Sequence, residues 1–133
     1  MKLKTAKILF WVITLLLTVG ILLSAVPSVL MLPYAVEHFT NHLGYPAYFL
    51  FFTGLTKILG LVAILLPGYP KIKEWAYAGF VFDLVGAIYS TIAVGDPPSS
   101  WMPIFIDLIL LIISYLLFRK IQKQSLAYSR VAV

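Results

Sequence analysis

The chain has 133 residues, of which 62% are hydrophobic and 11% are charged, with a net charge of +5 and no cysteine. A chain of this size cannot bury so much apolar surface in one soluble core, so lipid is its expected solvent. The absence of cysteine excludes disulfides and thiolate chemistry. The basic residues lie in short segments beside apolar runs rather than on one solvated face, so no nucleic-acid partner is expected.

Four apolar runs predict an all-α fold, an integral membrane four-helix bundle in one domain over residues 1–133. Each run approaches the ~20 residues that cross roughly 30 Å of hydrocarbon. The first contains Pro27 and is followed by Pro33, so we expect its helix to continue to about Val26. A kink or a segment that lies shallow in the membrane should follow. The fourth is expected to be short and to open beside Pro103. The predicted spans are 8–26, 47–66, 75–94 and 101–118.

The positions of the Lys and Arg residues predict the orientation of these spans. With four spans, nine of the ten basic residues fall on one side of the membrane: Lys2, Lys4, Lys7, Lys71, Lys73, Arg119, Lys120, Lys123 and Arg130. The positive-inside rule therefore places both termini in the cytoplasm, in a multi-pass arrangement. The first apolar run exceeds the usual 7 to 15 residues of a signal-peptide core. We therefore expect it to be a transmembrane helix rather than a signal peptide that is cleaved off.

Two oppositely charged residues fall near the middle of the predicted membrane. At ~1.5 Å per helical residue, Lys57 lies roughly 16 Å from the outer surface and Asp83 about 18 Å from it. A charged group at that depth costs free energy unless it is paired or hydrated, so we expect an ion pair between the second and third spans. It would serve either as a buried tether or as part of a polar cavity that binds a carbonyl or relays a proton.

Asp107 lies roughly 9 Å below the outer surface, where it either reaches Lys57 or faces water in an outer vestibule. The loop between the first two spans carries Glu37, His38 and His42. If this loop is helical, the two imidazoles lie one turn apart on one face. We expect a solvated interfacial helix, with a ligand-orienting or proton-handling role as the alternative. No metal site is expected, because a closed site needs more ligands than these histidines.

Four sequence pieces in the middle of the chain occur in a fixed order: LGYPAYF (43–49), KILGLVAILLP (57–67), KEWAYAGFVFDLVGA (73–87) and AVGD (93–96). With these pieces the chain resembles the DoxX and DoxX-like family of small four-helix membrane proteins. The resemblance implies a compact four-helix bundle and membrane-associated redox chemistry. One branch of the family resembles a subunit of an archaeal thiosulfate:quinone oxidoreductase, and another is linked to a complex that resists oxidants. The family and the topology together imply the plasma membrane of a prokaryote.

The resulting hypothesis is a bundle that binds a small lipophilic or quinone-like molecule between its helices, or supports a redox protein partner that does. Lys57, Asp83 and Asp107 would orient or protonate the ligand, with His38 and Glu37 near its outer entrance. No covalent cofactor is expected, and any enzymatic role would be that of a quinone-linked oxidoreductase subunit. A non-catalytic assembly or scaffold subunit is the alternative, and a small-solute transporter is less favoured. Ligand, partner and oligomeric state are left open.

Overall fold

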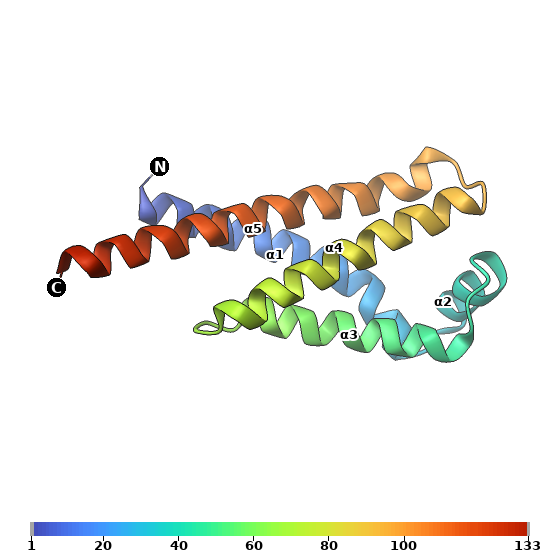
Figure 1. Cartoon of the computed structure of the whole chain (residues 1–133). Coiled ribbons are helices and arrows are strands. Elements are labelled where there is room, and N and C mark those ends of the chain that lie inside the picture. Colours follow the sequence, from blue (N-terminus) through green and yellow to red (C-terminus); the bar gives the residue numbers. More distant parts are fainter. Residues whose placement is uncertain (1, 133) are drawn as a thin grey trace.

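The computed structural model describes residues 2–132, which are almost entirely helical (Figure 1). The helices are α1 (Leu3–Val29), α2 (Pro33–Glu37), the π-helical turn η1 (His38–His42), α3 (Ala47–Leu65), α4 (Pro70–Ala93) and α5 (Pro98–Ala132). Four of them, α1, α3, α4 and α5, are long and apolar enough to cross a membrane. The predicted all-helical architecture with four spans is therefore confirmed.

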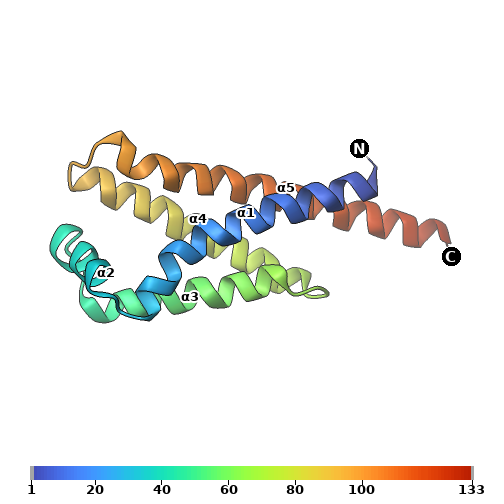
Figure 2. The same ribbon diagram turned by 180° about the vertical axis from the view of Figure 1, so that it is seen from behind.

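The four long helices form a bundle in which α1 packs against α3 and α5, and α4 packs against the same two helices. The N- and C-terminal segments lie at one end of the bundle together with the α3–α4 turn, and we call this the terminal end (Figure 1). The opposite end, the loop end, carries α2, η1 and the α4–α5 turn. Seen from behind, α1 runs along the bundle from the terminal end towards α2 (Figure 2).

The well-packed core occupies the terminal half of the bundle. Its buried members come from all four long helices: Leu17, Ile21, Leu61, Ile64, Tyr77, Phe80, Leu84 and Leu111. Inside this core the Ser114 hydroxyl is hydrogen bonded at 2.7 Å to both the Thr14 hydroxyl and the Tyr77 hydroxyl. Buried hydroxyls need partners, so this cluster joins α1, α4 and α5 where no water is available.

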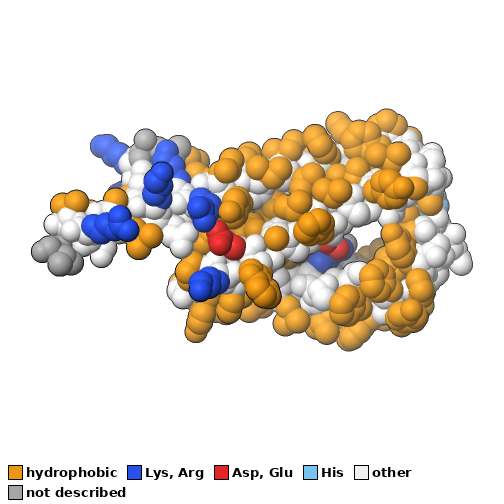
Figure 3. All heavy atoms as spheres, viewed as in Figure 1, with side chains coloured by type: hydrophobic (Ala, Val, Ile, Leu, Met, Phe, Trp, Pro, Cys, Tyr) orange, Lys and Arg blue, Asp and Glu red, His pale blue; other side chains and the backbone are white. Residues whose placement is uncertain are grey.

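Most of the outer surface is apolar, as a lipid-facing surface requires. Large hydrophobic side chains on it are freely exposed, including Leu23, Trp75 and Phe82, which keep 74%, 83% and 79% of their accessible surface. Hydrophobic side chains cover the visible face of the bundle, and the basic ones gather at the terminal end (Figure 3). A soluble protein rarely exposes an apolar surface this continuous.

Helix α1 extends further at the loop end than the sequence predicts. The helix expected to end near Val26 continues through Pro27 to Val29. The chain then turns at Met31, which has a positive φ of 53°, and Pro33 opens the short helix α2. Pro27 does not end α1, because neighbouring helices support the backbone of a membrane helix around a proline.

The helices that carry the last two spans also extend beyond the predicted spans. Helix α4 begins at Pro70 rather than near residue 75, because proline is well suited to the first turn of a helix. Helix α5 begins at Pro98, passes through Pro103 and continues for 35 residues, about 52 Å at 1.5 Å per residue. Its last turns extend past the other helices at the terminal end, where Lys, Gln and Ala favour a helix beyond the apolar run (Figure 1).

Close helix packing depends on Gly54 rather than on the glycines of α4. A Cβ placed on Gly54 would lie 2.8 Å from the Ser28 Cβ and 3.0 Å from the Val29 backbone nitrogen, so α3 and α1 touch there. A Cβ on Gly79 or Gly86 would meet no heavy atom within 4 Å. The glycines of α4 therefore leave space between the helices instead of closing it.

Candidate functional site

A cavity of about 410 Å³ lies at the loop end of the bundle, and we call it the loop-end cavity. Its walls come from the last turns of α1, from α2 and η1, from the first half of α3 and from the second half of α4, with Ile104 of α5. Pockets for small molecules usually measure about 300–1,000 Å³. The loop-end cavity is thus large enough for an organic ligand.

The short segment α2–η1 covers the mouth of this cavity and is held by two contacts to α4 and the turn after it. The His42 Nε2 lies 2.8 Å from both carboxylate oxygens of Asp96. The Tyr45 hydroxyl is hydrogen bonded to the Ser90 hydroxyl. Gly44 lies between these contacts with a φ of +83°, a conformation that glycine adopts without strain. We call the segment α2–η1 the cover. It is attached to α4 and the turn after it at its C-terminal end, and it is joined to α1 at its N-terminal end.

An aromatic wall lines one side of the cavity. The rings of Phe39 and Tyr45 stack with their centroids 4.8 Å apart, and Phe49 stacks on both at 6.3 and 6.0 Å. The three rings lie within 19 to 29° of parallel with one another. Parallel rings present flat, polarisable surfaces, which favour a planar ligand over a compact one.

Lys57 and Asp83 form the predicted ion pair, with the Lys57 Nζ 3.7 Å from the Asp83 Oδ2. Their side chains are 16% and 29% exposed, respectively. Lys57 also donates a hydrogen bond of 3.1 Å to the Ser24 hydroxyl of α1. The predicted pairing between the second and third spans is confirmed, and α1 contributes a partner that the charge pattern did not predict.

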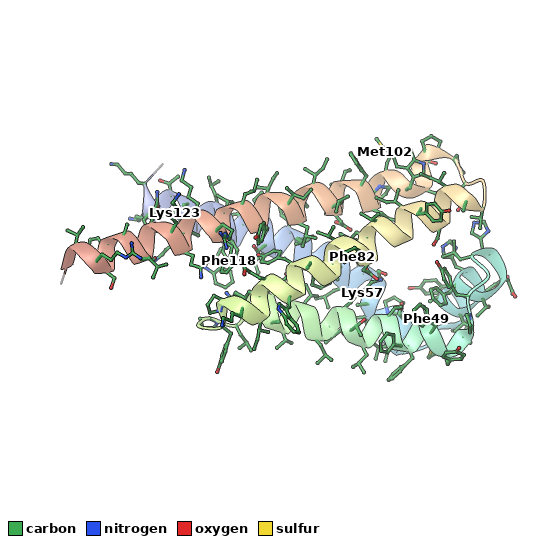
Figure 4. The ribbon with its side chains drawn as sticks, in the orientation of Figure 1. Phe49, Lys57, Phe82, Met102, Phe118 and Lys123 are labelled. Carbon is green, nitrogen blue, oxygen red and sulfur yellow. The ribbon has the colours of Figure 1, made fainter. Side chains whose placement is uncertain are left out.

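This ion pair lies at the inner limit of the loop-end cavity, and a smaller groove of about 140 Å³ reaches the same two side chains from between α3 and α4. One basic and one acidic side chain are visible in a hollow between these helices (Figure 3). Lys57 points into this space, close to Phe82 of α4 (Figure 4). A charged group therefore faces an apolar cavity that opens towards the lipid side of the bundle.

Asp107 is placed away from this cavity. Its carboxylate packs against Gly20 of α1, so closely that a Cβ added to Gly20 would lie 2.5 Å from the Asp107 Oδ1. It is not among the residues that line the loop-end cavity, and Lys57 pairs with Asp83 instead. Within residues 2–132, Asp107 therefore neither pairs with Lys57 nor lines the loop-end cavity. A proton-handling role for Asp107 stays a prediction.

The residues of the outer loop separate into two groups. The rings of His38 and His42 stack at 5.1 Å, as expected for two side chains one turn apart, and His38 lines the loop-end cavity. Glu37 is exposed and lines only a shallow outer depression. Over the described part of the chain, no three His, Cys, Asp or Glu side chains come together in a way that could hold a metal ion.

Four further polar residues were not predicted as part of the site. Ser24 supports Lys57, Tyr45 and Ser90 hold the cover, and Asp96 pairs with His42. Ser90 follows Asp83 by two helical turns on the same face of α4, and Asp96 belongs to the AVGD piece. The sequence thus contained a signal for these two, whereas Ser24 and Tyr45 depend on how the helices meet.

Comparison with known proteins gives one match. The model of the DoxX-like family matches residues 12–114, which include the four spans up to the middle of α5. No curated protein and no solved structure matches the chain. The matched region contains the loop-end cavity, its cover and the Lys57–Asp83 ion pair. The chain belongs to the DoxX-like family.

Proposed function

We propose that this membrane protein binds a small, flat, lipophilic molecule with a carbonyl group, such as a quinone, in the loop-end cavity. The single observation that carries the proposal is the ion pair of Lys57 and Asp83 at the inner limit of a cavity of about 410 Å³ that is otherwise largely apolar. The Lys57 ammonium would donate a hydrogen bond to the carbonyl oxygen. Asp83 would keep the lysine charged and oriented.

The remaining walls support the same ligand class. The stacked rings of Phe39, Tyr45 and Phe49 offer a flat surface to a conjugated ring. His38 at the entrance, with Glu37 beside it outside the cavity, would handle protons or orient the ligand near the surface. The hollow between α3 and α4 gives a lipophilic molecule a way in from the bilayer.

The protein would act as a ligand-binding subunit beside a redox partner in the plasma membrane of a prokaryote. We propose that its termini face the cytoplasm, because its basic residues gather at the terminal end (Figure 3). Asp107, which packs against Gly20 on the other side of the bundle, is proposed as a separate proton-handling group rather than as a ligand contact.

A scaffold role is the competing proposal, and the contacts of Lys57 give it specific support. Its ammonium joins α3 to both α4 and α1 through Asp83 and Ser24, as a structural tether would. A tether and a binding group differ in their response to a ligand. The experiment below separates them, because it blocks the cavity without changing any of these three residues.

The test is to fill the cavity from Gly86, which lines it and has open space around its Cβ position. Protein would be purified in discs of native membrane and analysed by mass spectrometry and visible absorption for a bound lipophilic molecule. We expect wild type to retain one at near one-to-one ratio and Gly86→Leu to lose it.

Ala78→Leu is the matched control, since Ala78 is an exposed small residue of the same helix that lines neither the loop-end cavity nor the groove between α3 and α4. It should retain the ligand and fold as stably as Gly86→Leu. An empty wild-type protein that instead brings down another membrane protein would support the scaffold role. Equal ligand retention by Gly86→Leu and Ala78→Leu would refute binding in the loop-end cavity.

A further inference from the structure

A second cavity, of about 430 Å³, lies at the terminal end of the bundle, and nothing in the proposed function uses it. It is enclosed by the first turns of α1, the α3–α4 turn, the start of α4 and the last third of α5. We call it the terminal cavity. It is separated from the loop-end cavity by the buried core around Leu17, Ile64 and Tyr77.

Lys73 is the most unusual residue of the terminal cavity. This lysine is only 8% exposed, although it belongs to the basic segment before the third apolar run. Its ammonium lies 5.6 Å from the ring centroid of Phe118. Within residues 2–132 this ammonium forms no ion pair or hydrogen bond. The burial of most of this side chain removes part of the hydration of its ammonium, and one aromatic face replaces only a small part of that loss.

The surroundings of Lys73 make the terminal cavity positively charged. Lys7 of α1 lines the same cavity, and no Asp or Glu is among its lining residues. The neighbouring acid, Glu74, is held by Arg119 at 2.6 Å and points into a different groove. The cavity wall also includes the first turn of α4, whose backbone N–H groups carry the positive end of the helix dipole. Two lysines thus line a cavity whose lining residues include no acidic side chain.

The other lining residues indicate what kind of anion would fit the terminal cavity. Trp11 and Tyr69 line the terminal cavity and are 44% and 55% exposed, which is typical of side chains at the boundary between lipid and water. Phe118 provides an apolar wall directly beside Lys73. The cavity therefore suits a ligand with a negative charge for the lysines and apolar chains for the aromatic wall. A phosphate group that carries acyl chains has both, since its charge would face the lysines and its chains would enter the surrounding lipid.

We propose that the terminal cavity is a binding site for an anionic phospholipid, with the phosphate between Lys73 and Lys7 and the acyl chains along α1 and α5. Basic pockets between membrane helices recognise anionic headgroups in this way. The bound lipid would neutralise Lys73 and connect the start of α4 to the two helices that carry the chain termini. The site is independent of the loop-end cavity and of any ligand there.

The test uses the full chain in nanodiscs of phosphatidylcholine to which phosphatidylglycerol is added, with native mass spectrometry to count the lipids that remain bound after release. Wild type should keep phosphatidylglycerol in preference to phosphatidylcholine. Lys73→Met should weaken this preference about fivefold, which corresponds to roughly 1 kcal/mol for one lysine near an anionic surface. Lys73→Arg should keep it, which shows that charge rather than packing is responsible.

Lys123→Met is the matched control, because Lys123 is an exposed lysine on the same end of α5 and does not line the terminal cavity (Figure 4). It should bind phosphatidylglycerol as wild type does. An equal loss in Lys123→Met and Lys73→Met would overturn the proposal in favour of general surface attraction, and an unchanged preference in Lys73→Met would overturn it outright. Inorganic phosphate that displaces phosphatidylglycerol at equal concentration would overturn the assignment to lipid.

Discussion

Lys57→Met removes the charge of the central ion pair while keeping a side chain of similar length and shape. At 3.7 Å, two unit charges attract by about 4.5 kcal/mol at an effective dielectric constant of about 20. Desolvation of both groups offsets much of that attraction. The variant leaves the Asp83 carboxylate, whose side chain is 29% exposed, without its cation. We therefore expect Lys57→Met to lower the free energy of unfolding by about 3 kcal/mol, the lower part of the range for breaking a buried pair.

The double variant measures the interaction between Lys57 and Asp83 apart from the interactions of each residue with its surroundings. Asp83→Asn in the Lys57→Met background removes the unpaired charge, so much of the lost stability should return, with a coupling energy of about 2 kcal/mol. The measurement is unfolding by titration with sodium dodecyl sulfate in mixed micelles, followed by circular dichroism. Lys71→Met, which removes an exposed lysine from the first turn of α4, is the control and should unfold like wild type. A coupling energy below about 0.5 kcal/mol would show that the two groups do not act together.

Three further predictions follow from single contacts. Gly54→Ala should cost about 1–3 kcal/mol of unfolding free energy, because its Cβ would overlap Ser28 and the α1 backbone, whereas Gly79→Ala should cost nothing in the same titration; equal effects would contradict the packing described for α3. Ser114→Ala leaves two buried hydroxyls without their shared partner and should cost about 1–3 kcal/mol, while a loss within error would mean that these hydroxyls find other partners. His42→Ala should lower stability by less than about 1 kcal/mol, because the pair is exposed, yet raise hydrogen exchange severalfold in residues 33–43 and not in α1; unchanged exchange in the cover would show that His42 does not hold it.

The sequence predicted the features that depend on position along a single helix. The rise per residue alone brought Lys57 and Asp83 to the same depth, and their ion pair is present. The stacking of His38 on His42 follows in the same way from one helical turn. These predictions succeed because a membrane helix is regular, and the chain cannot leave it without exposing backbone groups to lipid.

The features that depend on how helices face one another were not predictable. Asp107 packs against Gly20 because of the rotation of α5 relative to α1, and a hydrophobic pattern does not define this rotation when lipid and core are equally apolar. The contact between Tyr45 and Ser90 depends on the path of an irregular segment through Gly44. The ends of α1 and α5 were misplaced because proline marks a boundary in water more reliably than in a bundle.

The two halves of the bundle differ in a way that favours a binding pocket over a path for solutes. Beyond the Lys57–Asp83 pair, towards the terminal end, the space between the helices is filled by Leu61, Ile64 and Phe80, all less than 5% exposed. On the other side of the pair lies the loop-end cavity, with open space at Gly86. A molecule that enters from the loop end or from between α3 and α4 therefore reaches the charged pair and stops there. Passage to the terminal end would require the whole core to separate, which costs far more than moving the α2–η1 cover.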